Sequence, residues 1–386
     1  MKVAKKSYFS RARGWMTALV ASALSQLALL LEGTPTPNAL NRRPLEVGPE
    51  TTHYRFLIAG HVRGRGNQDE APLPAATFLS QIPRLDTLKL NFVVLLGDCF
   101  WRTEEPYLAN FRAQVLDRVP APIFNAPGNH DLTDRQRYAT EFGATHSWFR
   151  VGSELFILLD TEERDYLITG AQLEMLKSAC DFATREPGIS NVLIFSHKLI
   201  WSFANPFYAV MLSHGHGFPP PAQRDYFERE IRPLIEATAR TRHVYWFAGD
   251  TGSMPGTIPV LCQRDPNADI TFIATGLGDL SSDAWIFADI EHGRIGLTLE
   301  SMTGAELEPL ENYDVGYWQR RFNIDPLASN ESWAGTITLA VASVVVALGV
   351  LHLRGRQRRR AGNGGGNRYR FQDESEVGRR TGVPGL

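Results

Sequence analysis

Hydrophobic positions between residues 54 and 300 form short runs that alternate with amphipathic stretches. Apolar runs of about four to eight residues are typical of buried strands, whereas apolar residues recurring every three or four positions predict helices. The runs predict strands at residues 54–59, 91–96, 123–126, 147–151, 155–160, 191–196, 243–248, 270–275, 284–290 and 294–299. The amphipathic stretches predict helices at residues 75–85, 104–117, 134–142, 170–184 and 223–239. Strands alternating with helices predict an α/β fold in which helices cover a sheet.

Two longer apolar runs lie near the ends of the chain. Residues 15–31 follow five Lys or Arg side chains within residues 1–14, which is the pattern of a signal sequence. Residues 333–353 form an uncharged run of about 20 largely apolar residues, which is long enough to cross a bilayer as a helix. For the first run we predict an uncleaved anchor, with a removed signal peptide as the alternative. For the second we predict a transmembrane helix, with a buried core helix as the alternative.

Basic side chains flank both apolar runs on their outer sides. Arg354 begins a stretch of five arginines in seven residues. Because positively charged flanks stay in the cytoplasm, we expect a cytoplasmic tail and an extracytoplasmic segment between the two membrane helices. The predicted parts are a signal-anchor and linker at 1–50, a globular domain at 51–305, a linker at 306–332, the transmembrane helix at 333–353 and a basic disordered tail at 354–386.

The formal net charge of −2 conceals an acidic middle of the chain. Residues 1–14 and 354–386 together carry a net charge of +11, so the residues between them carry about −13. Nucleic acid is therefore not expected as a partner, since phosphate backbones bind to positive surfaces. The three cysteines are too few for a disulfide framework, and we expect free thiols.

Polar side chains follow several predicted strands at the point where each strand ends. In open α/β sheets, ligands bind at the carboxyl ends of strands, so side chains from separate strands can meet there. The candidates are His61 and Arg63 after the first strand, Asp98 after the second, Asn129 and His130 after the third, His197 after the sixth and Asp250 after the seventh.

Four motifs carry these residues in a fixed order. They read FVVLLGD at residues 92–98, APGNHD at 126–131, VLIFSH at 192–197 and HVYWFAGDTGS at 243–253. This order resembles the calcineurin-like metallophosphoesterase family over roughly residues 54–300. The resemblance implies a catalytic domain with a metallophosphoesterase-like four-layer β-sandwich flanked by helices and a two-metal site. With the terminal runs added, the predicted fold is α/β with N- and C-terminal membrane helices.

The resemblance also implies roles for individual residues. Asp98 would bridge two metal ions, Asn129 and His197 would bind the second ion, and His130 would lie beside the phosphate and assist the leaving group. The first motif departs from the family, because Gly60-His61-Val62-Arg63-Gly64 stands in place of Gly-Asp-x-His-Gly. An alternative alignment pairs His61 with the family's histidine and Ala59 with its aspartate.

The last motif departs as well, because Gly249-Asp250-Thr251-Gly252 stands in place of Gly-His-x-His. The second metal site therefore keeps four candidate ligands: Asp98, Asn129, His197 and Asp250. The first site keeps two, His61 and Asp98. We expect one strong site for a divalent metal (Mn, Fe, Zn or Mg), because such nitrogen and oxygen ligands do not choose among these ions.

The expected chemistry is metal-dependent hydrolysis of a phosphate ester. A metal-activated water would attack phosphorus. Arg63 would supply positive charge where the other ion would lie, and His130 would act as general acid. We expect the substrate at the extracytoplasmic membrane face, where lipid- or glycan-linked esters occur. One alternative is a catalytically degenerate family member that acts as an envelope binding or scaffold protein. Another is a different metal-dependent hydrolase on the same scaffold.

Overall fold

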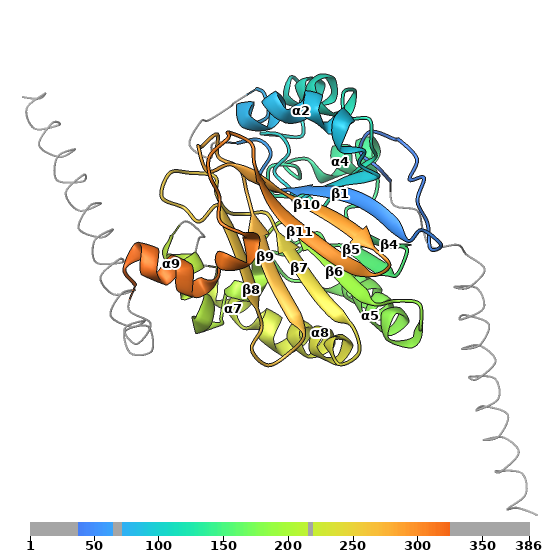
Figure 1. Cartoon of the computed structure of the whole chain (residues 1–386), viewed down its shortest axis with the longest axis vertical. Helices are drawn as coiled ribbons and strands as arrows, with labels where there is room; N and C mark the ends of the chain where they lie inside the picture. Colours follow the sequence, from blue (N-terminus) through green and yellow to red (C-terminus); the bar gives the residue numbers. More distant parts are fainter. Residues whose placement is uncertain (1–37, 65–71, 215–218, 325–386) are drawn as a thin grey trace, which may run out of the picture. The chain divides into compact units, whose positions relative to one another are not determined.

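The computed structural model describes residues 38–64, 72–214 and 219–324. Within these ranges the chain forms a mixed α/β structure with two β-sheets and helices outside them (Figure 1). No helix in these ranges is both long and apolar enough to cross a bilayer. The predicted membrane helices at 15–31 and 333–353 and the tail at 354–386 lie outside the described residues.

The first sheet has five strands in the order β11-β10-β1-β2-β3. Strands β1, β2 and β3 run parallel, whereas β10 pairs antiparallel with both β1 and β11. The carboxyl ends of the three parallel strands therefore lie at one edge of this sheet. The bounds are β1 (His53–Ala59), β2 (Phe92–Leu95), β3 (Ile123–Asn125), β10 (Ala284–Glu291) and β11 (Arg294–Ser301).

The second sheet has six strands in the order β4-β5-β6-β7-β9-β8. Strands β5, β6, β7 and β9 are parallel, and β4 and β8 pair antiparallel at the two edges. Every residue of β6 is buried, which is typical of a central parallel strand covered on both faces. The bounds are β4 (Ser147–Val151), β5 (Glu154–Leu158), β6 (Asn191–Ser196), β7 (His243–Ala248), β8 (Val260–Arg264) and β9 (Ile270–Thr275).

Helices cover the outer face of each sheet, which gives four layers in total (Figure 1). On the first sheet these are α2 (Ala76–Leu88), α3 (Tyr107–Phe111) with the π-helical turn η1 (Arg112–Leu116), and α4 (Arg135–Phe142). On the second sheet they are α5 (Gly170–Arg185) and the π-helical turn η4 (Phe227–Ile231) with α8 (Arg232–Ala239). Helix α5 buries Leu176, Ala179, Cys180 and Ala183, a three-to-four-residue spacing that gives one apolar face.

Shorter helical segments follow β6 and β11. They are η2 (Ile200–Ser202), η3 (Pro206–Tyr208), α6 (Ala209–Ser213), α7 (Pro221–Arg224), η5 (Leu310–Asn312) and α9 (Val315–Phe322).

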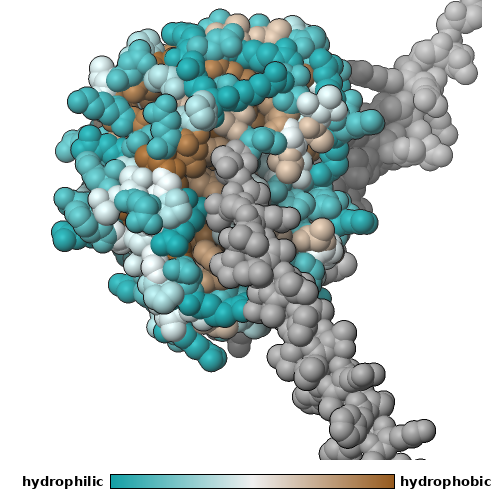
Figure 2. Space-filling view, turned by 90° about the vertical axis from the view of Figure 1, so that its right-hand side faces the viewer, coloured by the Kyte–Doolittle hydropathy of each residue, from teal (hydrophilic) through white to brown (hydrophobic). Residues whose placement is uncertain are grey.

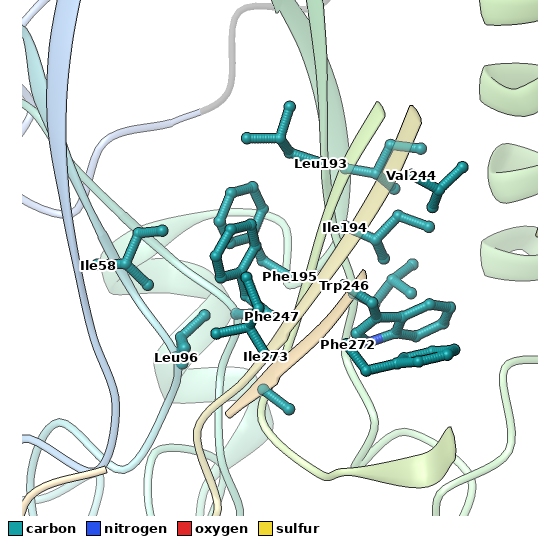
Figure 3. Packing of buried hydrophobic residues seen from close by; sticks show 14 of the residues in the cluster. Ile58, Leu96, Leu193, Ile194, Phe195, Val244, Trp246, Phe247, Phe272 and Ile273 are labelled. Carbon is teal, nitrogen blue, oxygen red and sulfur yellow. The ribbon is translucent and has the colours of Figure 1, made fainter. Parts of the chain in front are cut away.

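The main hydrophobic core lies between the two sheets and continues under the helices of the second sheet. In Figure 3, Ile58 of β1 and Leu96, directly after β2, lie opposite Phe195 and Phe247 of the second sheet. The rings of Phe195 and Phe247 are stacked with centroids 5.1 Å apart. Trp246 points to the other face of the second sheet, where it packs edge-on against Phe227 of η4.

Each of the ten predicted strands and five predicted helical regions overlaps an observed element. Two helical predictions needed correction in detail. Residues 104–117 form α3 followed by the turn η1 rather than one regular helix, and α3 begins after Pro106. Residues 223–239 are likewise divided, with Pro233 in the first turn of α8 directly after η4. Proline lacks the backbone N–H that a continuous helix would need at that position.

Strand β8 and helix α9 were not predicted. The sequence indicated a linker at 306–332, yet the described part of this range contains η5 and α9. The buried Trp318 of α9 donates from Nε1 to the carbonyl of Val260 in β8 at 2.8 Å. Residues 310–322 therefore pack on the second sheet as part of the described structure.

Figure 2 shows a face on which polar side chains lie around smaller hydrophobic areas. The large hydrophobic side chains that stay exposed in the described ranges are Leu73, Phe207 and Met254. The three cysteines are free thiols, as predicted.

Candidate functional site

The carboxyl ends of parallel strands from both sheets meet at one place. The loops after β1, β2 and β3 come from the first sheet, and those after β6 and β7 come from the second. His197, directly after β6, contacts the carbonyl oxygen of Leu96, directly after β2, through Nδ1 at 2.8 Å. The two sheets are thus joined at the position where sequence analysis placed the candidate site.

Two glycines permit this close approach. A Cβ on Gly249 would lie 2.1 Å from the carbonyl oxygen of Leu96, and one on Gly60 would lie 2.0 Å from that of Thr275. Real Cβ atoms do not approach backbone oxygens so closely, so these positions require residues without side chains. The glycines that precede His61 and Asp250 therefore bring the two sets of loops into contact.

Asp98 lies at the centre of the site and is only 2% exposed. Its Oδ1 accepts a hydrogen bond from the backbone N–H of His130 at 3.1 Å and lies 3.4 Å from His197 Nε2. Its Oδ2 lies 3.4 Å from both His61 Nε2 and Arg63 Nε. Burial by itself raises the pKa of Asp98, but the charges of the surrounding His197, His61, His130 and Lys198 hold it below its usual range. Asp98 is therefore a buried carboxylate.

The backbone at two site residues adopts a left-handed conformation. Asp98 has φ +51° and His61 has φ +52°. Left-handed non-glycine residues are uncommon and concentrate at functional sites. Burial lowers the pKa of His61 to about 4, despite the nearby charge of Asp98, so its imidazole is neutral at pH 7.

Arg63 and His130 both pack against the indole ring of Trp101. The guanidinium carbon of Arg63 is 4.5 Å from the centroid of the indole, a cation–π distance. His130 packs on the same indole with ring centroids 4.5 Å apart, and its Nδ1 donates to the carbonyl of Trp101 at 2.9 Å. His130 Nε2 is consequently directed into the site, 4.0 Å from Asp98 Oδ2. Burial lowers the pKa of His130.

Lys198 is a site residue that sequence analysis missed. Its ammonium group donates to Asp250 Oδ2 at 2.7 Å and to Asn129 Oδ1 at 2.9 Å. Burial opposes its charge, but Asp250 and Glu162 raise the pKa of Lys198 above its usual value. A lysine after a histidine at a strand end carries no distinct sequence signal, because its partners come from two other loops.

Asp131 is the second residue that sequence reasoning left without a role. It is fully buried and accepts hydrogen bonds from the backbone N–H groups of Cys99 and Gly128 at 2.7 and 3.0 Å and from the amide of Asn125 at 3.1 Å. Burial raises the pKa of Asp131 to about 6. Asp131 therefore fixes the loops that carry Asp98 and His130 relative to each other.

Three buried polar atoms of the predicted site residues have no hydrogen-bond partner among the described residues. They are His61 Nδ1, Arg63 Nη1 and His197 Nε2. Because a carbonyl can only accept, the contact with Leu96 assigns the proton of neutral His197 to Nδ1. Its Nε2 then faces Asp98 Oδ1 at 3.4 Å and Asp250 Oδ1 at 3.6 Å. Buried polar atoms are rarely left unpaired without a functional reason.

The predicted metal ligands are near one another but are differently engaged. His197 Nε2 lies 3.4 Å from Asp98 and 3.6 Å from Asp250, whereas Asn129 is linked to Asp250 through Lys198. In the described ranges, no group of three or more His, Cys, Asp or Glu side chains is arranged to hold a metal ion. The ammonium between Asn129 and Asp250 would repel a divalent ion placed among these four residues. As they lie here, the four predicted ligands do not fit the metal that the family resemblance implies.

A cavity of about 370 Å³ lies elsewhere, between α4 and β4. Tyr138, Phe142, His146 and Trp148 are among the residues that line it, and none of the seven predicted site residues does. Its lining offers no cluster of charged groups, so the strand-end site remains the candidate for chemistry.

Comparisons with known proteins give limited matches. No protein-family model matches the sequence, and no curated protein matches it. A purple acid phosphatase from yellow lupin (Lupinus luteus) seeds is similar in structure, with 13% identity and a TM-score of 0.47 over 68% of this chain and 54% of that chain. The chain thus spans about half the length of the lupin enzyme. A Thermotoga maritima protein is similar with 10% identity and a TM-score of 0.29 over 64% of this chain and 99% of that chain. Family membership stays a prediction from the motifs.

Proposed function

We propose that the strand-end site binds a phosphate ester and hydrolyses it. The observation that carries this proposal is the set of buried, unpaired polar atoms around Asp98, together with the side chains of Arg63, His130 and Lys198. Phosphoryl oxygens are strong acceptors for guanidinium, ammonium and imidazole N–H groups. A phosphate ester would supply the hydrogen-bond partner that Arg63 Nη1 lacks.

The chain's own residues suggest a sequence of proton and charge movements. Arg63 holds the phosphoryl oxygens and stabilises the charge that develops on them during attack by water. His130 protonates the leaving oxygen from Nε2, and the negative charge of the bound ester raises its affinity for a proton. The carboxyl group of Glu162, in the loop after β5, interacts electrostatically with Lys198, His197 and Asp250, so it belongs to the same site. Burial raises its pKa to about 7, although Lys198 opposes this shift. We assign Glu162 as the group that takes the proton from water.

The test is turnover of 4-nitrophenyl phosphate and bis(4-nitrophenyl) phosphate. We expect Asp98→Asn to abolish turnover, because Asp98 organises Arg63, His61 and His197. We expect Glu162→Gln to lower turnover without changing the binding of inorganic phosphate. The control is Asp181→Asn on the exposed face of α5, where the aspartate pairs with Arg185. Equal turnover by Asp98→Asn and the natural protein would reject the site.

A second candidate function is phosphate ester binding without turnover. The close pairing of Lys198 with Asp250 favours it, because mutual neutralisation leaves less positive charge for stabilising a transition state. This function would be supported if the natural protein hydrolyses neither ester but binds inorganic phosphate saturably. Asp98→Asn should then lose this binding.

We also propose membrane anchoring with the domain outside the cytoplasm and a lipid- or glycan-linked ester as substrate. The support is the pair of apolar runs with basic outer flanks at 15–31 and 333–353. Protease added to intact cells should digest the described domain and spare an epitope on the tail. A protected domain would contradict this orientation.

A further inference from the structure

Two side-chain cations lie among the predicted metal ligands. Lys198 Nζ contacts Asn129 Oδ1 and Asp250 Oδ2, which are two of the four ligands predicted for the second ion. Arg63 Nε lies 3.4 Å from Asp98 Oδ2, the oxygen that also faces His61, the other ligand predicted for the first ion. Each predicted ion position therefore has one cationic side chain against its carboxylate.

The two cations are held firmly. The Lys198 side chain is 12% exposed, and the backbone N–H of Lys198 donates to the hydroxyl of Thr161 at 3.1 Å, which fixes the loop that carries it. Arg63 is 6% exposed and packs on Trp101. Moving Arg63 out of the site would remove a positive charge from beside the buried Asp98, which is costly for a buried carboxylate. Moving Lys198 out would remove the ammonium that pairs with the partly exposed Asp250.

We propose that Lys198 and Arg63 replace the two metal ions, so that the site binds a phosphate ester without a divalent metal. The inference rests on the proposed function for its substrate. The claim that two side-chain cations occupy the ion positions rests on the contacts of Lys198 and Arg63, and metal binding tests it without any measurement of turnover.

The replacement also selects a class of substrate. Two divalent ions would bring four positive charges, whereas Arg63 and Lys198 bring two, which Asp98 and Asp250 offset. A monoanionic phosphodiester therefore meets less repulsion than a dianionic monoester. We expect a non-hydrolysable diester analogue to bind at least about tenfold more tightly than the matching monoester analogue. Tighter binding of the monoester would contradict this charge balance.

The decisive experiment is Mn²⁺ binding by the chelator-treated full chain. We expect the natural protein to retain less than about 0.1 Mn²⁺ per chain, and Lys198→Ala to bind about one, because Asp98, Asn129, His197 and Asp250 then become available. Mn²⁺ should raise the thermal midpoint of Lys198→Ala alone. Lys198→Arg keeps the charge and should bind as little Mn²⁺ as the natural protein, and so should Lys177→Ala on the exposed face of α5.

About one tightly bound Mn²⁺ in the natural protein would overturn the inference, and so would a folded Lys198→Ala that binds no more Mn²⁺ than the natural protein. If Lys198→Ala does not fold, the inference is tested by Mn²⁺ titration of Lys198→Gln and of the natural protein. The metal dependence of turnover is a second test. Turnover that persists after a chelator has removed divalent metals supports the inference. Turnover that needs Mn²⁺ overturns it and leaves the proposed function intact. No turnover under either condition rejects hydrolysis, while Mn²⁺ binding still decides the inference.

Discussion

Two buried carboxylates at opposite ends of the strands show how differently this molecule treats charge. Glu154 lies at the amino end of β5 and accepts hydrogen bonds from Tyr54 Oη at 2.8 Å, Asn191 Nδ2 at 2.9 Å and Ser153 Oγ at 2.8 Å. Asp98 lies after the carboxyl end of β2, and its contacts with ring and guanidinium nitrogens are 3.4 Å or longer. The first carboxylate accepts three side-chain hydrogen bonds of 2.9 Å or less, whereas the second accepts one backbone hydrogen bond at 3.1 Å, from His130, and makes only longer side-chain contacts.

This difference separates a structural polar cluster from a functional one. Complete hydrogen bonding of a buried group stabilises one conformation. Around Asp98, by contrast, the side-chain contacts are long, and nitrogen atoms of His61, Arg63 and His197 have no hydrogen-bond partner. A bound ligand can therefore form the missing hydrogen bonds. The comparison therefore predicts that changes near Asp98 affect function more than stability, and that changes near Glu154 do the reverse.

Among the changes that test this comparison, the largest effect is expected from His130→Ala. Loss of the general acid should lower turnover by about 10²–10⁴-fold. The thermal midpoint should change little, because the side chain makes one hydrogen bond, to Trp101. His130→Gln can keep that hydrogen bond but not the proton transfer, so it should be equally slow. A steady-state assay with melting curves measures both properties, and unchanged turnover in either variant would remove His130 from the mechanism.

The converse change is Glu154→Ala. It leaves the buried hydroxyl of Tyr54 and the amide of Asn191 without their acceptor, which should cost about 3 kcal/mol of the free energy of unfolding. Turnover below the unfolding transition should stay unchanged. Chemical denaturation beside the exposed control Glu174→Ala tests this, and a loss of turnover without a loss of stability would contradict the comparison.

Gly249→Ala should affect both properties at once. The added methyl group would collide with the backbone of Leu96, so overpacking should cost about 1–3 kcal/mol. If the loops after β2 and β7 move apart to relieve this clash, Asp250 moves as well. Gly48→Ala is the matched control, because nothing lies within 4 Å of its added Cβ. Denaturation and turnover measured on both variants would show whether loop contact and site geometry are linked.

The smallest effect is expected for the pH dependence of the thermal midpoint, through His243 near the amino ends of the strands. His243 begins β7, opposite Asn191 in the sheet, and burial lowers its pKa although Asp269 lies 2.7 Å from its Nδ1. A base whose pKa is lower in the folded state stabilises the fold above its unfolded pKa of about 6.5 and loses that contribution as pH falls below it. His243→Gln should therefore flatten the decline of the thermal midpoint below that pH. A curve parallel to that of the natural protein would contradict this.

Strand prediction succeeded where hydrophobic runs were long and bounded, as in β6 and β7. Strand β8 was missed because its sequence, VLCQR, becomes polar after three residues. Helix α9 was missed because its apolar face depends on Val315 and Trp318 packing against strand β8, which the sequence alone does not reveal.

The strand-end rule placed the candidate residues near Asp98 because parallel strands bring their carboxyl ends to one edge. The rule could not find Lys198, whose partners Asn129 and Asp250 are 69 and 52 positions away in the sequence. It also could not predict whether Asn129 faces a metal or an ammonium. Pairing among side chains from three loops depends on distances that only the folded chain sets.

The hydrogen bond between His197 and Leu96 has a further consequence for how the protein can be studied. Because both sheets contribute side chains to the site, neither sheet alone carries a working set. Catalytic assays would then report on the docking of the two sheets. Consider an intermediate that has native secondary structure but water between its two sheets. It would keep the far-ultraviolet circular dichroism spectrum of the native protein and show no turnover.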